Sequence, residues 1–262
     1  MAQRHGDFVG VFDSGVGGIS VLGHLTKELP RENFLFFGDS LYAPYGEKSR
    51  DWVLNRSRDI VDSLIEQGAK AIVIACNTAT SVAASTLRAE YAHIPIIGVE
   101  PALKPAVTDP RVNRVLVMAT PITLRLDKFQ QLAKKWGEGH EVIGVPCPGL
   151  ADCIERGDLE SPELHELVGQ LVGEYAGKVD AVVLGCTHYP FCAHVIREKV
   201  GDVMLFDGGA GTARQLHRKL AERDLETRSR AQGNVRFASS NEDEGEIELY
   251  KRYFAIASSL AE

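Results

Sequence analysis

The amino-acid sequence predicts an α/β protein of two similar lobes, each with a mostly parallel sheet flanked by helices. Short apolar segments alternate along the chain with longer segments whose apolar residues recur at helical spacing, the pattern of parallel sheets covered on both faces. One strand-and-turn motif occurs twice, as IVIACNTAT (Ile72 to Thr80) and as VVLGCTHYP (Val182 to Pro190). Its cysteines lie 110 residues apart, which is too long for a solenoid repeat and suits one cysteine in each lobe.

Length and composition are those of an ordinary globular protein. The 262 residues are 44% hydrophobic and 25% charged, enough to bury the core of one large domain or two small ones. The net charge of −7 argues against a nucleic-acid or anionic-membrane partner, because both favour basic surfaces. No apolar stretch reaches the roughly 18 residues that a membrane-spanning helix needs, and no signal peptide is evident, so we expect a cytoplasmic protein.

The first part of the chain reads as strands and helices in alternation. A glycine-rich turn, SGVGG, separates the first strand from its helix, Pro30 ends that helix, and Gly68 suits the C-terminal cap of the next helix. The expected elements are strand 8–13, helix 19–30, strand 33–39, a helix from Arg50 to the cap at Gly68, strand 71–76, helix 81–91 and strand 94–99.

The same alternation starts again at Arg114. The expected elements are strand 114–120, a helix around 124–136, the apolar segment 141–149, a helix around 162–175, strands 180–186 and 203–209, a helix near 212–223, strand 234–240 and a helix near 246–260. Ligands of open α/β sheets bind at the carboxyl ends of the strands. If two such lobes face each other, the cleft between them therefore receives both cysteines.

Cys76 directly follows an apolar strand, a position in which cysteine is often only a small buried hydrophobe. The residues after it, Asn77-Thr78-Ala79-Thr80, include N-cap formers and precede the predicted helix. A thiol at a helix N-terminus has a lowered pKa, and since the unperturbed value is about 8.5, a modest shift populates the thiolate at neutral pH. Cys76 is therefore a candidate base.

Cys186 repeats this arrangement, with Thr187, His188 and Tyr189 after it. Cys186 and His188 could instead be metal ligands, but no second cluster with metal-ligand spacing completes a site, so we expect no metal. They could also form a Cys–His pair for acyl transfer, which would leave Cys76 without a role. The remaining cysteines lack the strand-and-cap context and are assigned to packing or to simple surface thiols; they are Cys147, Cys153 and Cys192.

The segment FDSGVGG places a glycine-rich turn between a strand and a helix, which favours an anion at the helix N-terminus. It matches neither the dinucleotide-binding pattern nor the P-loop, so the signal for a nucleotide is weak, but its N–H groups are available to a carboxylate. Asp13 at the strand end is by itself an ordinary turn residue. Beside two thiols, a role in orienting or accepting protons competes with that interpretation.

Two thiols on opposite faces of a substrate have a specific use. One thiolate removes a proton from a carbon atom and a thiol on the other face returns one, so that the configuration inverts. Hydrolysis needs one nucleophile, and redox exchange needs two thiols close enough to bond. The repeated motif therefore favours stereoinversion.

Four motifs together resemble the glutamate racemases, the pyridoxal-independent enzymes of the aspartate/glutamate racemase superfamily. They are FDSGVGG, GDSLYAPYGEKS, ACNTAT and GCTHYPF, and the resemblance runs over essentially the whole chain. It implies two pseudo-symmetric lobes, residues 1–98 plus 207–262 and residues 99–206, with the active site between them. It also implies cofactor-independent interconversion of L- and D-glutamate, which supplies D-glutamate for peptidoglycan, and a homodimer.

The resemblance assigns roles residue by residue. It makes Cys76 and Cys186 the two bases and places Asp13 and His188 beside them as auxiliary acid–base residues. The positions that it assigns to binding the amino and carboxylate groups of the substrate are Asp13, Ser14, Tyr45, Gly46, Asn77, Thr78, Thr120, Thr187 and His188. Supporting positions are Asp39, Ser40, Pro44 and, in the segment CPGLADCIE, the acidic Glu155.

The chain departs from the family pattern at VMATPITLRLDKF, CPGLADCIE and FDGGAGTAR, where a pocket wall, effector sites and dimer contacts are expected to differ. Three alternatives remain open. The first is a racemase of aspartate or another amino acid, which substrate comparison distinguishes. The second is a binding or regulatory module that acts through a partner such as DNA gyrase, an effect that survives loss of both cysteines. The third is a thiol hydrolase, which forms a covalent acyl-enzyme on one cysteine only.

Overall fold

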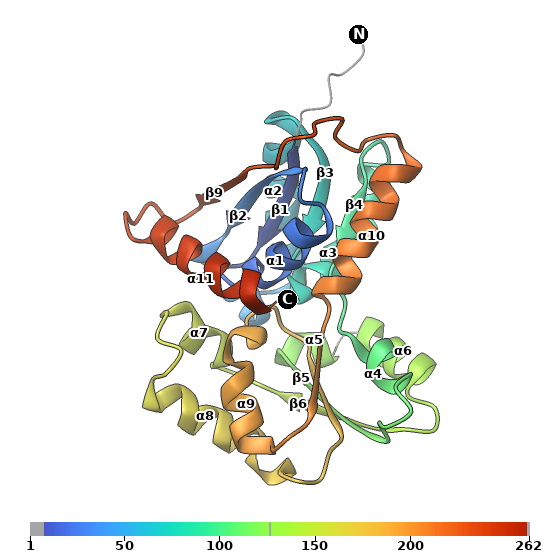
Figure 1. Ribbon diagram of the computed structural model, residues 1–262, viewed down its shortest axis with the longest axis vertical. Helices are drawn as coiled ribbons and strands as arrows, with labels where there is room; N and C mark the ends of the chain where they lie inside the picture. Colours follow the sequence, from blue (N-terminus) through green and yellow to red (C-terminus); the bar gives the residue numbers. More distant parts are fainter. Residues whose placement is uncertain (1–7, 126, 261–262) are drawn as a thin grey trace.

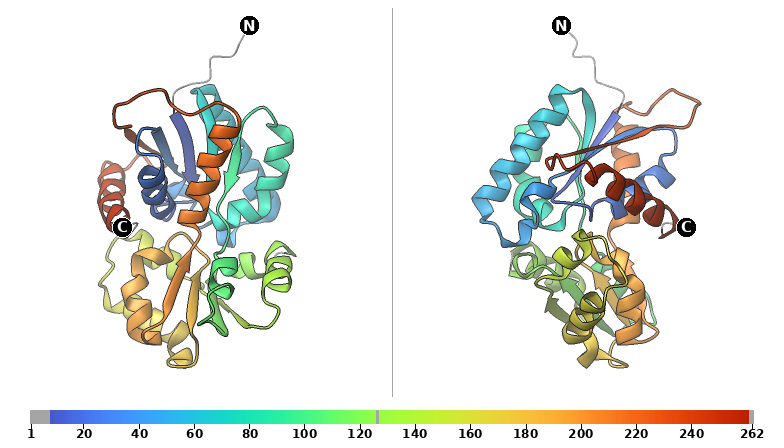
Figure 2. Two further views of the ribbon diagram at one scale, coloured as in Figure 1. Left: turned by 45° about the vertical axis from the view of Figure 1, so that its right-hand side comes forward. Right: turned by 90° about the vertical axis from the view of Figure 1, so that its left-hand side faces the viewer.

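The computed structural model describes residues 8–125 and 127–260, and it consists of two lobes, one above the other in Figure 1. Each lobe contains one sheet, and helices flank each sheet (Figure 2). The strand pairs in the described residues are all parallel. The predicted fold class, two α/β lobes with parallel sheets flanked by helices, is confirmed.

The first sheet has five strands. In spatial order they are β4 (Ile96–Gly98), β3 (Ala69–Ile74), β1 (Phe8–Asp13), β2 (Asn33–Gly38) and β9 (Val235–Ser239). Every residue of β1 and β3 is buried. Helices cover both faces of these strands, which explains why their sequences are nearly continuous apolar runs. The charged residue in β3, Lys70, pairs with buried Glu32 at 2.5 Å.

The second sheet repeats the order of the first. Its strands are β6 (Glu141–Pro146), β5 (Arg114–Ala119), β7 (Ala181–Leu184) and β8 (Met204–Asp207). In each lobe the first strand lies between the second and the third, and the fourth lies beside the third. Strand β9 is an addition to the edge of the first sheet. The two lobes are thus built on one topology.

This topology places the repeated cysteines at equivalent positions. The strand order reverses between β1 and β3 in the first sheet and between β5 and β7 in the second, and ligands bind at such reversals, beyond the carboxyl ends of the strands. Asp13 ends β1, and Cys76 follows the end of β3 by two residues. Thr120 follows β5 directly, and Cys186 follows the end of β7 by two residues.

Five helices cover the first sheet. They are α1 (Ile19–Glu28), α2 (Arg50–Glu66), α3 (Asn77–Glu90), α10 (Gly209–Glu222) and α11 (Glu246–Leu260). Helix α2 begins at the cap of Ser49, whose Oγ accepts the Trp52 N–H at 3.2 Å, and Gly68 follows its end with φ of 95°. Helices α10 and α11 pack against α1, so the C-terminal segment returns to the first lobe (Figure 2).

The second sheet is covered by shorter helices. They are α4 (Leu103–Val107), α5 (Pro121–Arg125), α6 (Asp127–Trp136), α7 (Leu150–Glu155), α8 (Pro162–Val172) and α9 (Ala193–Val200). Single 3₁₀ turns occur at Ser40–Tyr42, Tyr45–Glu47, Gly173–Tyr175 and Tyr189–Cys192. Helices α4, α7 and α9 were not predicted, because segments of five to eight residues show too little of the helical period. The predicted helix 124–136 is two helices, and part of it, residue 126, lies outside the described residues.

The chain connects the lobes twice, between β4 and α4 and between β8 and α10. On another side, α11 of the first lobe reaches the second: the Tyr253 hydroxyl donates to the Ile154 carbonyl at 2.5 Å, and the Tyr253 ring packs on Phe191. We propose lobe boundaries at 98/99 and 206/207; Asp207 itself still pairs with the second sheet. Among the described residues, no helix has both the length and the apolar character needed to cross a membrane.

Candidate active site

Cys76 caps helix α3 with its own sulfur. Its backbone is extended, and its Sγ accepts the N–H of Ala79 at 3.4 Å. The helix therefore starts at Asn77, several residues before the predicted start, and the cap is the cysteine and not one of the Asn or Thr residues after it. The Thr80 hydroxyl turns back instead and donates to the carbonyl of Ile74 at 3.1 Å.

The prediction of a lowered pKa at Cys76 is wrong. Burial raises the pKa of this thiol well above its ordinary value, and the negative charge of Asp13 raises it further. The N–H of Ala79 acts in the opposite direction but is the smaller effect. The charge of Cys186 also raises this pKa, so the two sulfurs lie within electrostatic range of each other. Burial and the neighbouring carboxylate therefore favour the thiol form of Cys76 over the thiolate.

Cys186 does not repeat the helix-cap geometry. The residues after it form a 3₁₀ turn, in which the N–H of Tyr189 donates to the Cys186 carbonyl at 3.2 Å, and α9 begins only at Ala193. Pro190 at the start of this turn has no N–H, so the backbone cannot continue the pattern seen after Cys76. The sulfur of Cys186 lies instead 3.5 Å from Nδ1 of His188.

His188 connects Cys186 to a carboxylate. Its Nε2 lies 2.5 Å from Oε1 of Glu155, and the same oxygen accepts the N–H of Val16 at 2.9 Å. Burial by itself lowers the pKa of His188, but the hydrogen bonds and charges of Cys186 and Glu155 outweigh it and hold that pKa well above the ordinary value. The chain Cys186–His188–Glu155 can therefore move a proton on and off the sulfur.

Asp13 is buried near Cys76 and accepts hydrogen bonds from both lobes. Its carboxylate accepts the N–H of Ser14 at 2.7 Å, the N–H of Gly18, and the hydroxyl of Thr187 at 3.1 Å. Burial raises the pKa of Asp13, although the charge of His188 and a hydrogen bond from the Cys76 thiol lower it. Asp13 is thus placed to accept the thiol proton of Cys76.

Most N–H groups of the glycine-rich turn are engaged within the protein, which the sequence did not predict. Three of them are occupied by carboxylates of the protein itself, since Ser14 and Gly18 donate to Asp13 and Val16 donates to Glu155. The glycines allow the second lobe to approach. A Cβ atom on Gly15 would lie 1.8 Å from Oε1 of Glu155, and one on Gly17 would lie 2.4 Å from Nδ1 of His188.

Polar groups from both lobes meet beside Cys76. The hydroxyls of Thr78 and Thr120 lie 3.2 Å apart, and the hydroxyl of Thr123 lies 2.8 Å from Thr120 and 3.4 Å from Thr78. Asn77 is buried, and its Oδ1 has no hydrogen-bond partner within the described part of the chain. A buried acceptor without a partner costs free energy, so Asn77 Oδ1 is suited to receive a ligand donor.

The loop after β2, which carries Asp39, Ser40, Pro44 and Tyr45, has side chains in two different environments. The Tyr45 hydroxyl donates to the buried Asp39 carboxylate at 2.5 Å, and the Arg56 guanidinium binds that carboxylate through two nitrogens at 2.8 and 2.5 Å. The Tyr45 hydroxyl therefore has no free hydrogen to donate to a ligand. Ser40 lies 2.8 Å from the Tyr250 hydroxyl of α11, which places its side chain away from both cysteines.

Gly46 and Pro44 flank Tyr45 in this loop. A Cβ atom on Gly46 would lie 3.1 Å from Cβ of Thr120, so the loop passes directly beside the threonine cluster of the second lobe. The peptide bond between Ala43 and Pro44 is cis. The hydroxyl oxygen of Ser14, the residue after Asp13, lies 3.8 Å from the sulfur of Cys76.

Sequence patterns missed three residues that position this site. Arg56 fixes Asp39, and Thr123 completes the threonine cluster. Ser20 in α1 donates to the carbonyls of Gly17 and Thr187, both at 2.8 Å, and so ties the turn of one lobe to the segment after Cys186. A buried serine on the apolar face of a predicted helix is the signal that could have identified it.

The site between the lobes is closed in this structure. Cys76 is 5% exposed and Cys186 is 7% exposed. The three remaining cysteines, which are Cys147, Cys153 and Cys192, are also buried, so none of them is a surface thiol. Cys76 and Cys186 are therefore almost completely shielded from solvent.

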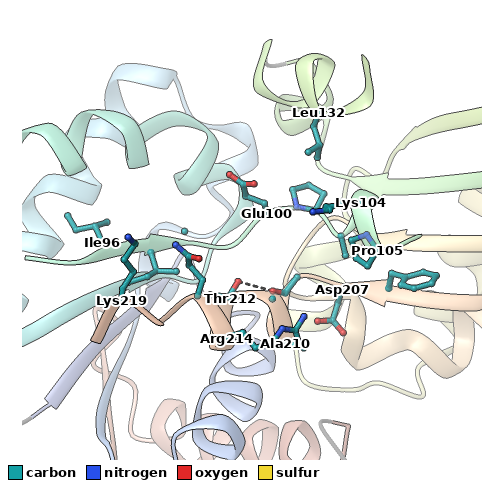
Figure 3. Close-up of a pocket in the computed structure, with 18 of the residues that line it drawn as sticks. Ile96, Glu100, Lys104, Pro105, Leu132, Asp207, Ala210, Thr212, Arg214 and Lys219 are labelled. Atoms are coloured by element: carbon teal, nitrogen blue, oxygen red, sulfur yellow. Dashed lines mark hydrogen bonds between the residues drawn. The ribbon is translucent and has the colours of Figure 1, made fainter. Parts of the chain in front are cut away.

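A cavity of about 1140 Å³ lies at the two connections between the lobes and is lined by neither Cys76 nor Cys186 (Figure 3). The connections lie side by side here, since a Cβ atom on Gly208 would be 2.4 Å from the Glu100 carbonyl oxygen. The basic residues along it are Arg88, Lys104, Lys135, Arg214, Lys219 and Arg223, against the acidic Glu100 and Asp207. The cavity is thus basic in a chain whose net charge is −7.

Known proteins share this architecture. The family model for Asp/Glu/Hydantoin racemase matches residues 27–216. A glutamate racemase of Clostridium perfringens is 47% identical over 250 residues, which are 95% of this chain and 96% of the relative. The structure of glutamate racemase from Francisella tularensis in complex with D-glutamate superposes with a TM-score of 0.82 at 28% identity, covering 97% of this chain and 95% of that chain. Escherichia coli glutamate racemase, solved with L-glutamate and the activator UDP-MurNAc-ala, gives a TM-score of 0.82 at 26% identity, with 95% and 96% covered.

Proposed function

The chain belongs to the glutamate racemases of the Asp/Glu/Hydantoin racemase family, and we propose that it interconverts L- and D-glutamate with Cys76 and Cys186 as the two bases. The reaction supplies D-glutamate for peptidoglycan, the role known for this family. The observation that carries the two-base assignment is the equivalence of the two sulfurs. Each follows the third strand of its sheet by two residues, beside the point where the strand order reverses.

The proton inventory balances without a further reactant. One cysteine, as thiolate, takes the α-hydrogen of glutamate as a proton and becomes a thiol, and the electron pair stays on the α-carbon, next to the carboxylate. The other cysteine, as thiol, delivers its proton to the opposite face and becomes a thiolate. The product has the inverted configuration, and the enzyme is left ready for the reverse direction.

His188 and Glu155 serve the Cys186 half of the reaction. His188 Nδ1 takes the thiol proton when Cys186 must act as a base and returns it when Cys186 must act as an acid, and the Glu155 carboxylate stabilises the protonated imidazole. This is the logic of a nucleophile, base and orienting carboxylate, applied here to proton transfer.

Asp13 serves the Cys76 half. Its carboxylate lies within electrostatic range of the Cys76 thiol, and burial makes it a better proton acceptor than an exposed carboxylate. The α-ammonium group of the substrate brings a positive charge beside the buried thiol, which lowers the pKa that burial and Asp13 have raised. Substrate binding therefore generates the thiolate only where the α-hydrogen is present.

The polar groups around Cys76 hold the substrate. The orphan acceptor Asn77 Oδ1 receives a donor from the α-ammonium group. The hydroxyls of Thr78, Thr120 and Thr123 donate to a carboxylate, together with the first N–H groups of α3, which have no acceptor within the helix. Since Thr120 and Thr123 belong to the second lobe, the substrate joins the two lobes when it binds.

The experiment that tests this function follows the circular dichroism of each enantiomer of glutamate with purified protein and no pyridoxal phosphate. We expect both to racemise, aspartate to react more slowly, and both Cys76→Ser and Cys186→Ser to lose the activity. Retention of full activity in Cys76→Ser would refute the two-thiol mechanism. Racemisation of aspartate in preference to glutamate would overturn the substrate assignment.

The chain Cys186–His188–Glu155 also has the connections of an acyl-transfer triad, which makes a thiol hydrolase the second candidate. That function needs only one cysteine. It predicts hydrolysis that survives Cys76→Ser and a covalent acyl group on Cys186, whereas racemisation is lost in the same variant.

Two further properties are inferred. A cytoplasmic location is supported by five free thiols, which a reducing compartment preserves. A homodimer is supported by the adjacent exposed side chains of Leu41 (60% exposed) and Tyr42 (37% exposed), since such apolar groups are typical of contact surfaces. Light scattering during gel filtration tests the dimer, and Leu41→Lys is expected to dissociate it if this surface forms the contact.

A further inference from the structure

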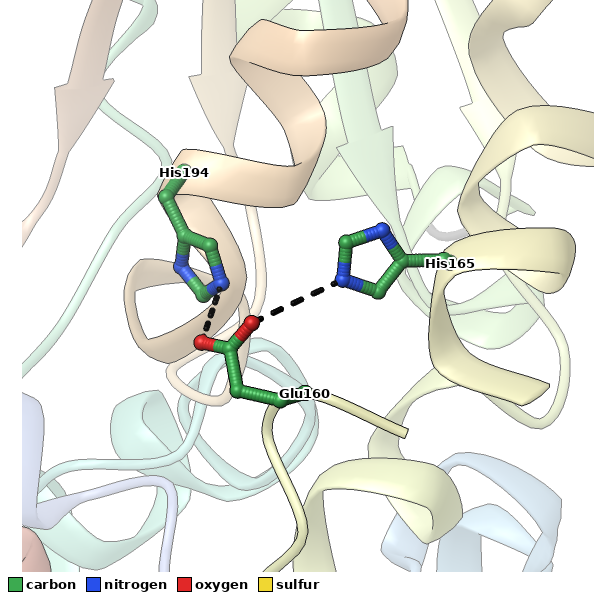
Figure 4. Close-up of side chains that lie close together, drawn as sticks. All are labelled: Glu160, His165 and His194. Atoms are coloured by element: carbon green, nitrogen blue, oxygen red, sulfur yellow. Dashed lines mark ion pairs between the residues drawn. The ribbon is translucent and has the colours of Figure 1, made fainter. Parts of the chain in front are cut away.

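Two histidines and a glutamate meet on the surface of the second lobe, outside the proposed proton relay. Glu160 precedes the cap of α8, His165 lies in α8 and His194 lies in α9 (Figure 4). One ligand atom from each of the three lies within 4.8 Å of the others. Both imidazole rings face the glutamate carboxylate in Figure 4, from two neighbouring helices.

The distances are close to those around a tetrahedral metal ion. Nε2 of His194 lies 3.0 Å from Oε1 of Glu160, and Nε2 of His165 lies 3.8 Å from Oε2. Ligands at about 2.0–2.1 Å from a tetrahedral zinc ion are separated by roughly 3.3 Å. Glu160 is 75% exposed and His194 is 50% exposed, so their side chains can rotate to that separation, and solvent can fill a fourth position.

Nδ1 of His165 has the kind of hydrogen-bond partner that metal-binding histidines commonly have. This nitrogen lies 3.2 Å from Oε2 of Glu198, and Oε1 of Glu198 pairs with Lys199 at 2.7 Å. Metal-binding histidines commonly donate their other N–H to a carboxylate, which fixes the tautomer and aims the free nitrogen at the metal. In His165 this arrangement aims Nε2 at Glu160 and His194.

We propose that Glu160, His165 and His194 bind one divalent transition-metal ion of the zinc class. Imidazole nitrogens favour such ions over magnesium and calcium, and the carboxylate supplies a negative charge in contact with the dication. With three protein ligands and an exposed position, the site binds more weakly than a closed structural zinc site.

The position gives an occupied site a mechanical effect. The ion would join α8 to α9 and to the loop that follows α7. Helix α9 directly follows the segment of Cys186 and His188, and α7 ends at Glu155. Metal binding therefore stabilises the part of the second lobe that carries the proposed proton relay.

The test titrates Zn²⁺ into the protein against a chromophoric chelator, in a Cys76→Ser/Cys186→Ser background that removes the thiols of the proposed active site. We expect one equivalent to bind, His165→Gln/His194→Gln to weaken binding at least tenfold, and Glu160→Gln to weaken it less. His217→Gln is the matched control. His217 lies between the carboxylates of Glu28 (2.8 Å) and Glu226 (3.3 Å), but within residues 8–125 and 127–260 no second imidazole completes a cluster there, so its loss should leave binding unchanged.

A second readout identifies the ligands directly and does not need the cysteine variants. Co²⁺ bound to the wild-type chain should show a visible spectrum without a thiolate charge-transfer band, and the spectrum should disappear in His165→Gln/His194→Gln. Zinc should also raise the Tm of wild type but not of this variant. Unchanged affinity in the double histidine variant, equal loss in His217→Gln, or a thiolate band would overturn the proposal, and the three side chains would then be ordinary ion pairs.

Discussion

Replacement of Glu155 by glutamine removes one charge from the proton relay and keeps its shape. In the wild type, the Glu155 carboxylate accepts the N–H of Val16 at 2.9 Å and lies 2.5 Å from His188 Nε2. Glu155 belongs to the second lobe and Val16 to the first. Glutamine can still accept the Val16 N–H through its carbonyl oxygen. It cannot stabilise a protonated His188, so the change acts on the Cys186 half of the reaction.

The magnitude follows from the loss of the negative charge from the hydrogen bond between Glu155 and His188. A hydrogen bond to a charged group contributes about 1.5–3 kcal/mol, and about 1.36 kcal/mol corresponds to a factor of ten in rate. We therefore expect Glu155→Gln to lower kcat/KM by about 10- to 150-fold. The two enantiomers have equal free energy in solution, so the equilibrium constant is unity and kcat/KM must fall by the same factor from both sides. The separate values of kcat need not change equally.

The assay is the initial rate from each enantiomer by circular dichroism over a range of pH. Glu155 helps to raise the pKa of His188 in the wild type, and removal of its charge lowers that pKa. A protonated His188 is needed to hold Cys186 as thiolate, so activity on the alkaline side should be lost at lower pH in the variant. Glu163→Gln is the control, because the exposed Glu163 carboxylate pairs with Arg156 at 2.7 Å and with the Cys153 thiol at 3.8 Å, and among the described residues it has no hydrogen bond to His188 or Val16. Full kcat/KM with an unmoved alkaline limb in Glu155→Gln would refute the relay.

Four further outcomes are expected. Asn77→Ala should raise KM for both enantiomers roughly tenfold, since a bond to the substrate ammonium is lost, and an unchanged KM would contradict this role. Gly17→Ala should lower kcat/KM more than tenfold by displacing His188, whereas Gly211→Ala, with open space around it, should not. Tyr253→Phe should lower the free energy of unfolding by about 1 kcal/mol and the Tm by roughly 2–4 °C in calorimetry, because the bond to Ile154 is lost. The thiols of the folded protein should react with Ellman's reagent far more slowly at pH 7 than those of the unfolded protein. All five thiols are buried, and burial raises the pKa of Cys147 to about 12. Rapid reaction of any of the five thiols would contradict the closed site.

The sequence predicted those features that depend on short-range patterns. The apolar runs identified the strands because both faces of the central strands are buried, and the doubled cysteine motif marked equivalent strand ends. Gly68 ended its helix as its conformational freedom suggests. These features are encoded within a few residues of where they occur.

Features that depend on the approach of distant segments could not be predicted in the same way. Glu155 contacts Val16 across 139 positions of sequence, so neither the glycine requirement at the turn nor the occupation of its N–H groups is visible locally. The pKa of Cys76 was predicted with the wrong sign because burial outweighs the helix N-terminus. Pro190 altered the turn after Cys186, so that two similar motifs have different local structures.

The measurement that tests the central claim most directly is proton exchange in deuterated water. Each enantiomer of glutamate is incubated separately with the protein, and the α-hydrogen is followed by NMR at early times. Two bases on opposite faces predict that deuterium appears almost entirely in the inverted product, while the recovered starting enantiomer keeps its original α-hydrogen. They also predict loss of racemisation in either Cys76→Ser or Cys186→Ser. Deuterium appearing equally in both enantiomers from the start, or racemisation that persists without one of the thiols, would contradict the account.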